Sequence, residues 1–144
     1  MLKIEEELER QGEIIIVASG ISMRPMLHPD NNVLKIKKIE KPLKKYDVVL
    51  FKRGENTVLH RIIKVYENSY DISGDSTYNI ERNVERDDII GILSDFVTNS
   101  RDTSDLHWIS VENGFYQFYA RMVVLLMPLR RGLLGIYIKI KDRK

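Results

Sequence analysis

A chain of 144 residues is long enough to form one domain with a sizeable core and too short for two. Hydrophobic residues make up 43% of the sequence and charged residues 31%, which is typical of a globular protein and excludes a disordered or fully membrane-embedded one. The net charge of +2 gives no reason to expect a nucleic-acid partner, and the absence of cysteine excludes disulfide bonds, cysteine-ligated zinc and thiol catalysis.

The N-terminal residues predict a short helix rather than a targeting segment. Residues 3–11 are rich in Glu, Leu and Arg, and we expect the helix to end at Gly12. Residues 1–10 have neither the basic start nor the apolar run of a secretory signal. The sequence also contains no uncharged apolar run of about 18 residues, so we expect no membrane-spanning helix.

The middle of the chain reads as short strands separated by Gly, Pro and Asn turns, which indicates a mainly β fold with a coiled, barrel-like core over residues 13–111. Residues 76–87 are polar and predict a loop, and the polar stretch 98–105 is the best candidate for an internal linker. The strands are predicted over residues 13–19, 33–39, 46–52, 57–66, 70–73, 89–97 and 106–111.

Residues 112–144 form a helical, basic extension of the same domain. A helix is predicted over residues 115–129 with an interruption at Pro128, followed by an apolar stretch over 133–140 and a basic tail. The helix has two interpretations. It packs over an open end of the β core, or residues 115–144 contact a membrane peripherally, with apolar side chains in the bilayer boundary and Arg and Lys at anionic headgroups.

Ser22 stands in a turn that comes after the first predicted strand. Gly20 lets the backbone turn sharply, and Pro25 fixes φ three residues after the serine, so the hydroxyl of Ser22 would lie on a rigid corner. Most turns built from Gly, Ser and Pro carry no chemistry, so the stretch alone favours a plain turn. The same arrangement also displays a nucleophile, and motifs later in the chain decide between the two interpretations.

Three further motifs occur in a fixed order: Leu59-His60-Arg61 in a predicted strand, the turn Ser73-Gly74-Asp75, and the strand start Asp88-Ile89-Ile90-Gly91. Together with the Ser-Met-x-Pro turn at Ser22, they resemble the signal peptidase I and self-cleaving repressor superfamily of serine proteases. The resemblance covers residues 14–97. It implies a coiled, barrel-like β fold and a serine endopeptidase that cleaves an extended leader or precursor peptide without a cofactor.

The resemblance also implies roles for individual residues. Ser22 matches the nucleophile, which forms an acyl-enzyme once a base has taken its proton. Bacterial signal peptidases use a lysine as that base, but the matching position here is His60, as in the catalytic subunit of the endoplasmic-reticulum and archaeal enzymes. Histidine suits the task because its ordinary pKa is about 6.5. The oxyanion hole would use the backbone N–H of Ser22.

A histidine base usually needs a carboxylate to hold its tautomer. Asp75, in the Gly-Asp turn, is the favoured third member, and Glu81 is the alternative because histidine-type relatives place an aspartate near that position. Either residue would otherwise be a solvated loop carboxylate. Arg61 would tie its strand to a neighbouring carboxylate or remain a surface charge. The sequence identifies no further substrate-binding residue.

Typical signal peptidases carry an N-terminal membrane anchor, and we expect this chain to depart from them because its first residues show no such segment. We therefore expect it to act in the cytoplasm or peripherally at the inner face of the membrane. No metal site is expected, since His28, His60 and His107 share no metal-ligand spacing.

Two alternative functions stay open. One is a non-catalytic β module that retains the peptidase fold and binds a peptide or a membrane. The other is a self-cleaving, repressor-like protein, which is disfavoured because residues 1–12 cannot hold a helix-turn-helix and no Ala-Gly site precedes Ser22.

Overall fold

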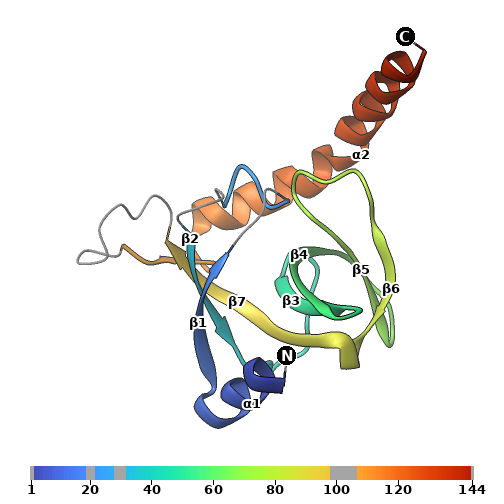
Figure 1. Cartoon of the computed structure of the whole chain (residues 1–144). Helices are drawn as coiled ribbons and strands as arrows, with labels where there is room; N and C mark the ends of the chain where they lie inside the picture. The colour runs from blue at the N-terminus through green and yellow to red at the C-terminus, as the bar shows by residue number, and fades with distance from the viewer. Residues whose placement is uncertain (1, 19–21, 28–31, 98–106, 144) are drawn as a thin grey trace.

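The computed structural model describes residues 2–18, 22–27, 32–97 and 107–143 (Figure 1). The predicted linker at 98–105 lies outside them. The fold is mainly β, as predicted: eight strands form one antiparallel sheet curved into a half-barrel, with a helix at each end of the chain. In chain order the elements are α1 (Leu2–Gln11), β1 (Glu13–Ala18), β2 (Asn32–Lys37), β3 (Val48–Arg53), β4 (Asn56–Val65), β5 (Ser69–Ser73), β6 (Glu81–Glu85), the 3₁₀ turn η1 (Arg86–Asp88), β7 (Ile89–Val97), β8 (Ile109–Ser110) and α2 (Gly114–Asp142).

The order of the strands in the sheet differs from their order in the chain. The sheet runs β1-β2-β7-β3-β4-β5-β6, and β8 pairs with β7. Strand β7 therefore joins the β1–β2 pair to the β3–β6 part of the sheet. Register shifts occur in the β2–β7, β3–β7, β4–β5 and β5–β6 pairs. Such irregularities increase the local twist of a sheet, which accounts for the curvature of the half-barrel.

Two clusters of buried apolar side chains form the core. The period of two along β4 places Leu59 against the first cluster, and Val58 and Ile62 in or against the second. The two faces of β4 therefore pack against different clusters. The first cluster also contains Met23 and Met26, which come from the turn that begins at Ser22. The core thus anchors the loop that carries the predicted nucleophile.

The prediction of a loop over residues 76–87 was wrong for residues 81–85, which form β6. This strand lies at the edge of the sheet and pairs only with β5 among the described strands. Val84 is its only apolar residue, and it packs against the second core cluster. An edge strand with one apolar residue shows no alternation in sequence, because most of its side chains face water. The pairing with β5 decides its structure.

The predicted interruption at Pro128 was also wrong, because α2 continues through this residue. Asn113 caps the helix by accepting hydrogen bonds from the backbone N–H groups of Phe115 and Tyr116. A proline inside a helix removes one hydrogen bond and bends the axis without always ending the helix. Figure 1 shows the first part of α2 lying against the β-domain and the later part projecting from it.

Of the α-helices in the described part of the chain, neither combines the length and apolarity that a membrane crossing requires.

The predicted first helix and its end at Gly12 are confirmed, and Gly12 takes the positive φ of 79° typical of a residue after a helix. The predicted strands over the first part of the chain and over 89–97 match β1 to β5 and β7 with small shifts at their ends. The last one is shorter than predicted.

Candidate active site

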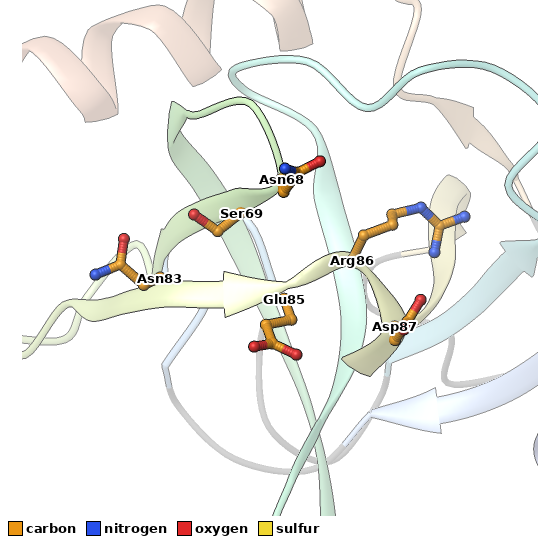
Figure 2. A pocket seen from close by; sticks show the side chains of 6 residues that line it. All are labelled: Asn68, Ser69, Asn83, Glu85, Arg86 and Asp87. Carbon is orange, nitrogen blue, oxygen red and sulfur yellow. The ribbon is translucent and has the colours of Figure 1, made fainter.

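A polar cavity of about 460 Å³ lies beside β5, β6 and η1, and none of the predicted catalytic residues lines it (Figure 2). No histidine lines it, so it holds no side chain that is an ordinary base near neutral pH. Within the described residues, no group of three or more His, Asp and Glu side chains is placed to hold a metal ion. The lining residues are Asn68, Ser69, Asn83, Glu85, Arg86 and Asp87.

Ser22 begins a turn that is fixed from both sides. Met23, Met26 and Leu27 are buried in the core, and the N–H of Leu27 donates to the carbonyl of Met23 at 2.9 Å. The carbonyl of Ser22 itself accepts a hydrogen bond of 2.9 Å from the N–H of Ser76. Ser22 is half-buried. The turn is therefore held against both the core and the loop after β5.

His60 lies on β4, which the neighbouring strands β3 and β5 flank on both sides. Its side chain is buried, and its ring centroid lies 6.0 Å from that of Phe51. Burial, helped by the positive charge of Arg53 and opposed by the negative charge of Asp75, lowers the pKa of His60 to about 4. The imidazole is therefore neutral at pH 7 and free to accept a proton, as a general base must be.

Gly74 is the point at which these two parts of the chain meet. A methyl group on Gly74 would lie 2.6 Å from the carbonyl oxygen of Ser22, 2.9 Å from Cγ2 of Thr77 and 3.0 Å from Nε2 of His60. Only glycine fits between these atoms. The backbone of Ser22 and the imidazole Nε2 thus lie beside the same glycine. This crowding explains why the Gly-Asp turn has glycine at position 74.

Ser22 and His60 also line one cavity, of about 610 Å³. This volume lies within the range of ligand-binding clefts in proteins. The remaining lining residues are Arg53, Val58, Thr77, Tyr78, Asn79 and Glu81. Two residues that are far apart in the sequence, and that were predicted as nucleophile and base, therefore share one cavity.

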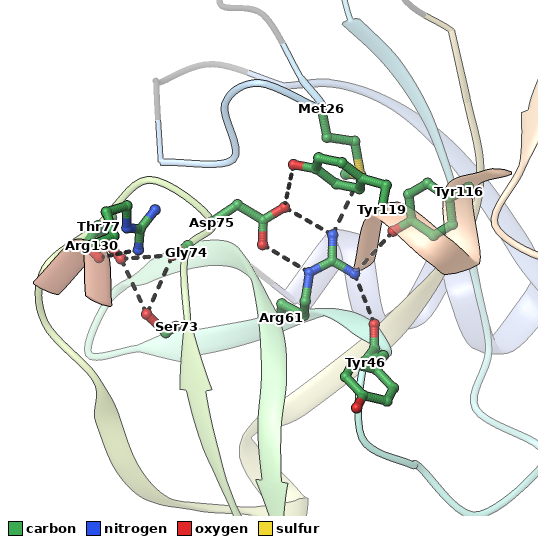
Figure 3. Close-up of polar contacts among 10 residues, drawn as sticks. All are labelled: Met26, Tyr46, Arg61, Ser73, Gly74, Asp75, Thr77, Tyr116, Tyr119 and Arg130. Carbon is green, nitrogen blue, oxygen red and sulfur yellow. Dashed lines mark hydrogen bonds and ion pairs between the residues drawn. The ribbon is translucent and has the colours of Figure 1, made fainter. Parts of the chain in front are cut away.

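Asp75 is buried and bound to groups other than His60. Its two carboxylate oxygens accept hydrogen bonds of 2.8 Å from Nε and Nη2 of Arg61, and the hydroxyl of Tyr119 donates to it at 3.0 Å (Figure 3). Arg61 is fully buried and also donates to the carbonyl of Tyr46 at 3.0 Å and to the hydroxyl of Tyr116 at 3.3 Å. The predicted link between Arg61 and a carboxylate is confirmed. This cluster joins β4, the turn after β5, and α2.

Glu81 is the carboxylate that faces the ring of His60. Its Oε1 lies 3.5 Å from Nδ1 of His60, and it also forms an ion pair with Arg53. Nδ1 has no hydrogen-bond partner among the described residues, so its contact with Glu81 is not a hydrogen bond, and it is one between charged groups only when the imidazole is protonated. The geometry therefore favours the alternative third member, Glu81, as the group that orients the imidazole, whereas Asp75 holds the turn.

Sequence reasoning missed several residues of the site, among them Arg53, Tyr78 and Tyr119. Arg53 could have been found, because the β3–β4 register pairs Phe51 with Val58 and so places Arg53 on the same face as His60. Tyr78 lines the cavity from a loop that has no periodic pattern. Tyr119 contacts Asp75 from α2, and no local signal predicts such a tertiary contact.

Comparison with models of known protein families, with curated proteins and with solved structures found no match for this chain.

Proposed function

We propose that this chain is a signal-peptidase-like serine endopeptidase that cleaves a leader or precursor peptide. The observation that supports the proposal is the meeting of Ser22 and the neutral, buried His60 beside Gly74 in one cavity. A hydroxyl becomes a nucleophile when a positioned neutral base takes its proton. No cofactor is needed for this chemistry.

In the proposed reaction, Nε2 of His60 takes the proton from Oγ of Ser22 while Oγ attacks the carbonyl carbon of the scissile peptide bond. The C–N bond then breaks, the imidazolium gives its proton to the leaving amine, and an acyl-enzyme remains on Ser22. Water, deprotonated by the same imidazole, hydrolyses the ester and restores the serine. Every proton that His60 takes is returned within the cycle.

Charge develops on two groups during the attack. The imidazolium forms in a buried site, which disfavours it, and the carboxylate of Glu81 at 3.5 Å from Nδ1 would stabilise it. The oxyanion of the tetrahedral intermediate would receive a hydrogen bond from the backbone N–H of Ser22. We place the protein in the cytoplasm or at the inner face of the membrane, with a peptide or precursor protein as its substrate.

A fluorophosphonate probe tests the nucleophile directly. We expect the probe to label the wild-type chain and to fail with Ser22→Ala and with His60→Gln, because the first lacks the reacting oxygen and the second lacks the base. Ser69→Ala is the matched control, since Ser69 lines the other cavity and should leave labelling unchanged. Equal labelling of wild type and Ser22→Ala would contradict the proposal. Absence of labelling in the wild type would favour the non-catalytic peptide-binding module.

A further inference from the structure

One face of α2 carries a stripe of apolar side chains that points away from the β-domain. Its buried residues, Tyr116, Ala120 and Met127, lie on the opposite face. The members of the stripe recur at intervals of three, four or seven, which places them on one side of a helix with 3.6 residues per turn. Six of them, each at least 56% exposed, are Phe118, Leu125, Leu129, Leu133, Ile136 and Ile140. We call this six-residue set the apolar stripe.

The same region of the chain is strongly basic. Residues 114–144 contain seven Lys or Arg and one Asp, so their net charge is +6, and the other 113 residues carry −4. No acidic residue occurs within residues 114–141. Two copies of this helix would repel each other along a shared stripe, whereas an anionic surface would attract both copies. The charge therefore favours an anionic partner over a second copy.

We propose that α2 lies in the interface of an anionic membrane. The apolar stripe would enter the boundary of the acyl chains, and Arg121, Lys139 and Arg143 would contact phosphate headgroups. This combination of a strong apolar face with a basic polar face is typical of helices that lie on a bilayer and do not cross it. Figure 1 shows the later part of α2 projecting from the β-domain, so the sheet does not lie against this part of the helix.

Membrane binding would also position the candidate active site. Nη2 of Arg130 donates to the carbonyl of Thr77 at 2.8 Å, and the guanidinium of Arg131 lies 5.6 Å from the ring centroid of Tyr78. Thr77 and Tyr78 line the cavity of Ser22. The helix that contacts the membrane thus holds one wall of the cavity. A peptide that emerges at the bilayer surface would be the natural substrate, a consequence that rests on the proposed function.

Co-sedimentation with vesicles tests the binding without any enzymatic step. We expect the wild-type chain to bind vesicles of phosphatidylcholine mixed with phosphatidylglycerol, and binding to weaken as salt is raised. Replacement of three stripe residues, Leu125→Ser, Leu129→Ser and Leu133→Ser together, should lower partitioning about tenfold or more. The matched control removes exposed apolar residues of β1, Ile15→Thr with Val17→Thr, and should bind like the wild type.

Two further variants complete the experiment. Lys139→Gln with Lys141→Gln keeps the stripe and should bind anionic vesicles more weakly, and circular dichroism would verify that each variant is folded. Ser22→Ala should bind like the wild type, which separates this inference from the proposed function. Equal partitioning of the stripe variant and the wild type would overturn the inference. If the chain dimerises in solution through α2 and does not bind vesicles, the inference is overturned and a second copy of the chain covers the apolar stripe.

Discussion

At the scale of single residues, the geometry of the site depends on Gly74, because glycine has no side chain. Gly74 lets the carbonyl of Ser22 and Nε2 of His60 both approach the same backbone position, and the nearest obstacle to a methyl group there is a backbone oxygen. A backbone atom cannot turn aside as a flexible side chain can. Any larger residue at position 74 must therefore move the loop of Ser22 or the strand of His60.

Gly74→Ala should consequently impair chemistry more than stability. Displacement of a reacting group by about 1 Å costs roughly a hundredfold in rate, so probe labelling should fall by about that factor. Overpacking of this kind costs about 1–3 kcal/mol of unfolding free energy. Gly132→Ala is the control, since an added methyl there meets nothing within 4 Å. Labelling rates and urea unfolding would be measured, and full activity in Gly74→Ala would contradict the placement of Ser22 beside His60.

The pKa of His60 predicts the pH dependence of the proposed reaction. With a pKa of about 4, the imidazole is neutral over most of the accessible range, so the labelling rate should be flat above about pH 5 and fall as the pH drops through 4. Arg53→Gln removes a positive neighbour that lowers this pKa, so the acid limb should move to higher pH. Arg82→Gln, on an exposed side chain paired with Asp71, should leave the limb in place.

The same pKa affects stability. The unfolded chain binds a proton at its histidine below about pH 6.5, whereas the folded chain resists protonation until about pH 4. Above about pH 6.5, His60 is neutral in both the folded and the unfolded chain, so it does not make the free energy of unfolding depend on pH. As the pH falls from about 6.5 to 4, the unfolded chain takes up the proton first, so the free energy of unfolding decreases.

At the scale of elements, the cluster around Arg61 connects three parts of the fold. Arg61 comes from β4, Asp75 from the turn after β5, and Tyr116 and Tyr119 from α2. The two charged groups are fully buried at their side chains, so each depends on the other for compensation. Removal of one partner leaves a buried charge, which is far more costly than the net stabilisation that the pair supplies.

The two candidate carboxylates should therefore behave differently when each is replaced. Asp75→Asn should destabilise the fold by roughly 3–5 kcal/mol, because Arg61 loses its counter-charge. Glu81→Gln should leave unfolding nearly unchanged and lower probe labelling at least about tenfold, because the imidazolium loses its carboxylate. Glu85→Gln, on the exposed part of the same strand, is the control for Glu81. If Asp75→Asn keeps native-like stability but loses probe labelling, Asp75 and not Glu81 orients the imidazole of His60.

At the scale of the whole molecule, periodic and local features were predictable, and long-range pairings were not. β-branched runs and turn residues located β1 to β5 and β7, and the order of the short motifs placed Ser22 and His60 together. The strand that carries Glu81 gave no periodic signal, because an edge strand is specified by its neighbour more than by its own sequence. The sequence left open whether Arg61 binds a carboxylate or lies at the surface, since its burial depends on tyrosines that come more than fifty residues later on α2.

The position of β7 between β2 and β3 determines when the candidate site can assemble during folding. Ser22 precedes β2 and His60 belongs to β4, and among the described strands only β7 joins these two parts of the sheet. During synthesis, Ser22 and His60 would be made early and yet stay apart until residues 89–97 have left the ribosome. Pairing of strands so distant in sequence folds slowly, so the candidate site would assemble late in folding.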